Sequence, residues 1–107
     1  MGGGTLARRT TSKSAGYLTC ASGTASTAMG RSTSATELNA TAMGWQTTAS
    51  GNSSTATGYL TTASGESSSS MGRETLASGP YSKATGYLTT ASGEASTALG
   101  RSTPATE

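Results

Sequence analysis

The stretch Ser-Thr-Ala-Thr-Gly-Tyr-Leu-Thr-Thr-Ala-Ser-Gly at residues 54–65 contains the pattern that decides the fold. Its two glycines, Gly58 and Gly65, lie seven residues apart, and this spacing extends from Gly16 to Gly100 without an insertion or a deletion. Only Glu37 replaces a glycine within that register. A register kept this strictly indicates one small structural unit stacked on itself many times.

The full repeat is 14 residues long, because two kinds of seven-residue half alternate. The position four residues before the register position is threonine in one kind of half, and serine or alanine in the other. About seven such repeats cover residues 10–107, which we predict to be a single repeat domain. Residues 1–9 are expected to form a disordered or capping N-terminal segment.

The positions four and two residues before each register position predict the inside of the fold. In an extended strand these positions share one face, and here that face carries only Ser, Thr and Ala. We therefore predict a narrow all-β solenoid whose hydroxyl groups pair along each column, since an unpaired buried hydroxyl costs about 1–3 kcal/mol. The predicted inward residues are Ala21, Ala28, Ala49, Ala63, Ala91, Ala98, Thr61 and Thr89.

Each glycine of the register is expected to supply a turn with positive φ, which glycine adopts most freely. Glu37 then predicts a different or strained corner, or a break between two blocks of coils. The composition alone would also fit a disordered Ser/Thr/Gly-rich linker, because the chain has no Val, Ile or Phe. A linker, however, needs no seven-residue register.

One outward column of the predicted solenoid is apolar. Met and Leu side chains precede alternate glycines, and aromatic or Arg side chains follow the same glycines. Exposed apolar stripes of this length mark interfaces, although such side chains could also simply cover the corners of the coils. A core of Ala, Ser and Thr buries little apolar area, so we expect association through the stripe. The predicted interface residues are Met29, Met43, Met71, Leu99, Trp45, Tyr59 and Tyr87.

The half-repeat Ser-x-Ala-x-Gly, at residues 26–30, 54–58 and 96–100, resembles the YadA-like head repeat of trimeric autotransporter adhesins. That repeat is also 14 residues long, with an alternating second half such as residues 59–65. The resemblance implies a left-handed parallel β-roll that forms a homotrimer on the outer membrane of a bacterium. It also implies attachment to extracellular matrix proteins or other cells, and a role in virulence.

The chain departs from this family in two respects. The Val and Ile positions of the family motif hold mostly Thr, Met or Leu here. The chain also shows no neck motif, heptad stalk or membrane-anchor segment, so we expect a head alone, with no membrane insertion by this segment.

The composition argues against catalysis. The chain contains no histidine and no aspartate, so its many serines have no visible base to activate them. With Cys20 as the only cysteine, neither a metal site nor an internal disulfide is expected, and no cofactor motif is present. The short basic pair Arg8-Arg9 is too small to indicate nucleic-acid binding.

Two other functions compete with adhesion. The first is ice binding, because outward hydroxyl pairs recur at Thr48/Ser50, Thr62/Ser64 and Thr90/Ser92. The second is a phage tail or spike segment, where similar β-solenoids also occur. The sequence favours a non-catalytic adhesin head over both.

Overall fold

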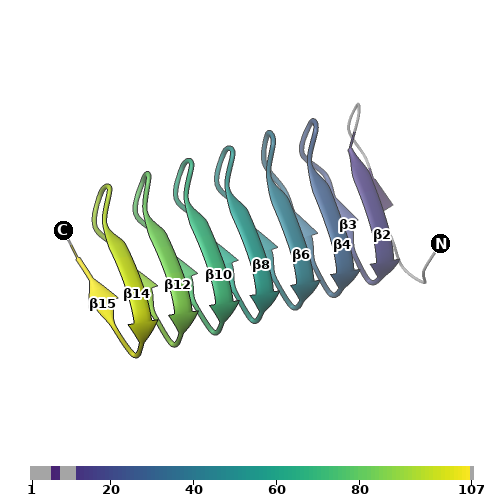
Figure 1. Ribbon diagram of the computed structural model, residues 1–107. Helices are drawn as coiled ribbons and strands as arrows, with labels where there is room; N and C mark the ends of the chain where they lie inside the picture. The colour runs from purple at the N-terminus through teal and green to yellow at the C-terminus, as the bar shows by residue number, and fades with distance from the viewer. Residues whose placement is uncertain (1–5, 8–11, 107) are drawn as a thin grey trace.

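The structure, a computed structural model, describes residues 6–7 and 12–106, which form 15 β-strands and no helix (Figure 1). The long strands are β2 (Lys13–Tyr17), β4 (Thr27–Arg31), β6 (Thr41–Trp45), β8 (Thr55–Tyr59), β10 (Ser69–Arg73), β12 (Lys83–Tyr87) and β14 (Thr97–Arg101). The short strands are β1 (Leu6–Ala7), β3 (Cys20–Ala21), β5 (Ser34–Ala35), β7 (Thr48–Ala49), β9 (Thr62–Ala63), β11 (Leu76–Ala77), β13 (Thr90–Ala91) and β15 (Pro104–Ala105). The predicted segment at residues 1–9 lies almost wholly outside the described residues.

Each 14-residue coil contributes one long strand and one short strand to two parallel sheets. The seven long strands form one sheet in coil order, and the short strands form the other. Every pairing joins residues 14 positions apart, as for Trp45 and Tyr59 in β6 and β8. The Cα atoms span 38 × 21 × 10 Å, so the molecule is a thin slab with the coils stacked along its length. The prediction of an all-β solenoid with about seven turns is confirmed. No helix in residues 12–106 could span a membrane.

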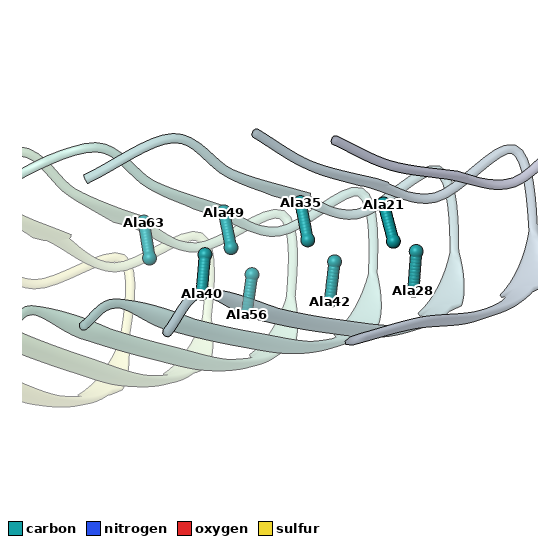
Figure 2. Packing of buried hydrophobic residues seen from close by; sticks show 8 residues of the cluster. All are labelled: Ala21, Ala28, Ala35, Ala40, Ala42, Ala49, Ala56 and Ala63. Carbon is teal, nitrogen blue, oxygen red and sulfur yellow. The ribbon is translucent and has the colours of Figure 1, made fainter. Parts of the chain in front are cut away.

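The space between the two sheets is filled by alanine, serine and threonine. Alanines from the two sheets point toward one another across this space (Figure 2). Of the residues predicted to point inward, Ala98 is 2% exposed and the other seven are completely buried. The core therefore consists of side chains so small that the two backbones lie close together.

Most interior hydroxyl groups do not pair along the rod, which corrects the sequence-based expectation. The Oγ1 atoms of Thr33, Thr47, Thr61 and Thr89 are buried and have no hydrogen-bond partner. Pairing occurs instead across a coil, where serine replaces the inward alanine of a long strand. Ser70 Oγ lies 2.5 Å from Thr75 Oγ1, and Ser14 Oγ lies 2.6 Å from Thr19 Oγ1. The buried threonine hydroxyls of this column thus face alanine, and they find a partner only at Thr19 and Thr75, where serine replaces that alanine.

The positive-φ prediction is wrong for the turn glycines. The glycines with positive φ lie within the long strands, for example Gly58 at 121° and Gly72 at 116°. A Cβ added to Gly58 would overlap the carbonyl oxygen of Gly72 in the next coil. The glycines at the turns, such as Gly51 and Gly65, have no positive φ and are instead needed because the next coil passes too close for a side chain.

The tight corners adopt the left-handed conformation with residues other than glycine. One corner follows each long strand and includes Leu18, Leu60 and Glu74, with φ of 57°, 56° and 55°. A second left-handed residue follows each turn, such as Ala25 and Tyr81, both with φ of 60°. These corners are held from coil to coil by backbone hydrogen bonds, as from the Leu60 N–H to the Trp45 carbonyl oxygen at 2.9 Å.

No break in the stack occurs at Glu37, so of the two alternatives expected there the break between two blocks of coils is wrong. The short strands β5 and β7 on either side pair in the same register as all the others. The hydrogen bonds of this turn to the next coil are weaker. The bond from the Thr36 N–H to the Ala49 carbonyl oxygen is 3.2 Å, against 2.9 Å for the equivalent bond from Ser22 to Ala35, and the Glu37 N–H does not make the bond that the Gly51 N–H makes to the Ala63 carbonyl oxygen. Glu37 is accommodated because this turn position requires no positive φ and because the turn lies farther from the next coil than the glycine turns do, as its longer hydrogen bond indicates. Its side chain is exposed.

Candidate functional surface

The outer face of the long-strand sheet carries the most varied side chains of the slab. Every long strand points three residues outward, at its first, third and fifth positions, because side chains alternate along a strand. Because the strands pair in register, each position forms a column that runs the length of the rod. These three columns contain the chemistry that distinguishes one coil from the next.

The fifth positions form a continuous stack that we name the Arg–aromatic ladder. Its members, one from each coil, are Tyr17, Arg31, Trp45, Tyr59, Arg73, Tyr87 and Arg101. The two adjacent rings of the ladder, Trp45 and Tyr59, have centroids 4.5 Å apart.

Each arginine of the ladder lies against aromatic rings of neighbouring coils. The Arg31 guanidinium carbon is 5.6 Å from the Tyr17 ring centroid and 5.8 Å from that of Trp45. The Arg73 guanidinium is 5.2 Å and 5.6 Å from the flanking tyrosine rings, and that of Arg101 is 5.5 Å from Tyr87. These distances are within the range of cation–π attraction, so every level of the ladder supports its neighbours.

The third positions form the apolar column beside the ladder. Met29 and Leu99 are 40% and 60% exposed, while Met43 and Met71 are half-buried. In the ladder, Trp45 is 40% exposed, and Tyr59 and Tyr87 are half-buried. The structure thus brings all seven predicted interface residues onto one face.

Charge is distributed unequally over the slab. All lysines and arginines among residues 12–106 point out from the long-strand sheet, namely Lys13, Arg31, Arg73, Lys83 and Arg101. The glutamates of the same range lie between strands, at the turns or corners, namely Glu37, Glu66, Glu74 and Glu94. The cationic face is therefore bordered by carboxylates that stand at the margins of the slab.

The outer face of the short-strand sheet is mainly a hydroxyl surface. Thr48, Thr62 and Thr90 occupy one column and are half-buried. Exposed Leu76 and Pro104 interrupt this column, and half-buried Cys20 precedes it. This face is regular but carries no charged side chain on its strands.

A shallow hollow of about 280 Å³ lies beside Glu37. It is lined by Ser22, Gly23, Thr24, Thr36, Glu37 and Leu38. Within the described part of the chain, no group of three His, Cys, Asp or Glu side chains could hold a metal ion. The hollow offers one carboxylate and a few hydroxyls, which is too little to build a defined site.

The repeats match the family model of the YadA head domain repeat, two copies at a time, over residues 21–47, 35–61, 63–88 and 77–103. The chain belongs to the YadA head family. Matches starting at residues 21 and 35, and again at 63 and 77, are offset by one 14-residue coil. The unit that matches the YadA head family is therefore the 14-residue coil, as the resemblance of the repeats predicted. A search of curated proteins gave no match.

The YadA head match covers most of the strands, but it does not indicate the ladder, which the structure shows. Sequence reasoning placed the aromatic and Arg residues in one column but did not predict that Arg31, Arg73 and Arg101 stack on the rings. The available signal was the 14-residue recurrence of Arg between aromatic residues. Residues 14 positions apart are direct neighbours in parallel coils, about 4.8 Å apart.

Proposed function

We propose that this YadA head is the attachment domain of a trimeric autotransporter adhesin at a bacterial surface. In this proposal residues 10–107 form the head, a left-handed parallel β-roll that assembles as a non-catalytic homotrimer. Family membership supports this function, because YadA heads are surface-exposed adhesin domains associated with trimeric assemblies. The binding target would be an extracellular matrix protein or another cell surface.

The observation that carries the trimer is an exposed apolar column on a molecule with an unusually small core. The interior of each coil contributes only Ala, Ser and Thr, and several of the buried hydroxyls lack a partner. At about 25 cal/mol per Å² such a core gives little hydrophobic stabilisation. Covering Met29, Met43, Met71 and Leu99, with the aromatic rings beside them, would supply the burial that a single chain lacks.

The trimer is tested by introducing charge into the apolar column. The double substitution Met43→Lys and Met71→Lys would place unpaired ammonium groups in the interface, which is costly. We expect the parent chain to have the mass of a trimer by light scattering, and the double variant to dissociate and lose β-sheet circular dichroism. The control is Lys13→Met with Lys83→Met, at the edge column of the same sheet, which should leave the mass unchanged. A parent chain that is a stable monomer at micromolar concentration would contradict the proposal.

Attachment is assigned to the hydroxyl face of the short-strand sheet, which an interface on the opposite face leaves accessible. Repeated shallow contacts suit avidity, because each coil presents nearly the same chemistry. The regular hydroxyl columns also keep ice binding as the second candidate, although Leu76 and Pro104 interrupt them. Thermal hysteresis without binding to immobilised matrix protein would favour ice binding, and the reverse result would favour adhesion.

A further inference from the structure

In the proposed trimer, on which this inference rests, particular surfaces of neighbouring chains must meet. A ring of three identical chains joins two different surfaces of the same protomer, so these surfaces must be complementary. If the ring axis runs along the rod, rotation keeps each coil at its own height. The two surfaces must then be complementary at each height along the rod, which we call a level. At every level, residues of one coil meet residues of the same coil in the neighbouring chain.

Two edges of the slab carry the side chains that vary from coil to coil. The ladder edge, where the long strands end, lies at the arrowheads in Figure 1, and the loops project on the opposite side. We name the second margin the loop edge, defined by the residue after each turn. Its members are Thr24, Leu38, Asn52, Glu66, Pro80 and Glu94, and all six are exposed.

The two edges cannot contact each other within one chain. Each loop-edge residue precedes the ladder residue of the same level by seven positions, as Glu66 precedes Arg73. The strand Ser69–Arg73 alone extends about 13 Å at about 3.3 Å per residue, and Glu66 lies in the turn beyond its start, so the two residues are more than about 13 Å apart. The slab itself is 21 Å wide, so the edges lie on its opposite sides.

The chemistry of the two edges nevertheless matches at each level. Glutamate stands at the levels of two arginines, in the pairs Glu66/Arg73 and Glu94/Arg101, and never at the level of an aromatic ring. Apolar residues stand at the levels of aromatic rings, in the pairs Leu38/Trp45 and Pro80/Tyr87.

The remaining two levels pair uncharged polar residues with ladder residues. These are Thr24 with Arg31 and Asn52 with Tyr59. No level sets like charges together.

From this match we infer that the loop edge of one chain docks on the Arg–aromatic ladder of a second copy in the same coil register. The stacked arginines are oriented for such a contact, since cation–π packing occupies the guanidinium faces and leaves the N–H donors at the rim. Arg73 of one copy would then bind Glu66 of the next copy, and Trp45 would pack on Leu38. The ladder thus sets the register of the trimer, while the apolar column beside it supplies burial.

Disulfide trapping tests this docking on the full chain. The variant Glu66→Cys with Arg73→Cys, in a Cys20→Ser background, places thiols on the two edges at one level. A disulfide requires Cα atoms within about 7 Å, so these cysteines can bridge only between chains. We expect oxidation to give covalent dimers and trimers on a non-reducing gel. The matched control, Glu66→Cys with Arg101→Cys, is offset by two coils, about 10 Å along the rod, and should remain monomeric on the gel.

Each outcome distinguishes the docking from the trimer itself. A light-scattering trimer in which the 66/73 pair does not cross-link, or cross-links no better than the 66/101 control, would overturn the edge pairing and leave the trimer intact. Products that stop at dimers would overturn the ring. A monomeric parent chain would overturn the proposed function. If the 66/73 variant does not assemble under reducing conditions, the pair Asn52→Cys with Tyr59→Cys applies the same test one coil earlier, at a level that contains no arginine.

Discussion

The inner and outer faces of the long-strand sheet obey opposite rules. At the inward position of each long strand the described chain uses only alanine or serine, as at Ala56 and Ser70. One residue further along, the outward position holds Met, Thr, Leu or Ala in different coils. The inner face is therefore limited by space and hydrogen bonding, whereas the outer face is free to vary. This difference implies that the inner face determines the fold and the outer face determines what the coils contact.

The largest loss of stability is expected from a substitution that places a side chain between adjacent coils of the rod. Gly72→Ala would place a Cβ against the carbonyl oxygen of Gly86, which is fixed backbone. We expect loss of more than about 4 kcal/mol of unfolding free energy, or no folding at all, measured by urea denaturation at fixed protein concentration. The control is Gly100→Ala, where φ is 112° but the added Cβ would meet only Thr103 Cγ2 at 3.7 Å. This control retains only backbone strain, about 1–3 kcal/mol; equal losses at the two sites would contradict the steric explanation.

Crowding across the slab should give the next largest effect. Ala63 is completely buried, so Ala63→Leu forces the two sheets apart and should cost about 3 kcal/mol or more. Its neighbour Thr62 points outward at the position that Leu76 occupies in the next coil, so Thr62→Leu should change stability by less than about 0.5 kcal/mol. Thermal unfolding of the two variants measures the difference. A larger loss for the Thr62 variant would mean that inside and outside have been reversed.

The smallest change in stability is expected when a single hydroxyl group is added to or removed from the space between the two sheets. Ser70→Ala removes the partner of Thr75 Oγ1 and should cost about 1–2 kcal/mol. Ala56 occupies the equivalent position one coil earlier, at the level of the unpartnered Thr61 hydroxyl, so Ala56→Ser should stabilise by up to about 1 kcal/mol. Urea midpoints of the two variants should therefore shift in opposite directions. Two shifts of the same sign would show that alanine packing outweighs hydroxyl pairing here.

The coil length and the inner positions could be predicted from the sequence because both depend on strict periods. Side chains alternate every two residues in a strand, so small residues at paired positions, such as Thr61 and Ala63, identified one face directly. The two kinds of glycine could not be separated in this way. Gly58 and Gly65 look alike in sequence, yet the first requires a positive φ within a strand and the second only requires space at a turn.

The corners and the ladder were beyond sequence reasoning for related reasons. Leu60 and Glu74 have no strong preference for the left-handed conformation, and the hydrogen bonds of adjacent coils impose it on them. The apolar column was predicted as one stripe, because a 14-residue recurrence suffices to define it. The stacking of Arg73 between two tyrosine rings depends on side-chain directions that the recurrence does not specify.

The constant 14-residue pairing also affects how such a head can fold and lengthen. Each new coil closes a loop of the same length onto the coil before it, so the entropy cost of closure does not increase with the size of the stack. Relative contact order, which is the mean sequence separation of contacts divided by chain length, falls as coils are added. A longer head therefore meets no additional topological barrier, and its length can change by whole coils without altering the interactions that make each coil fold.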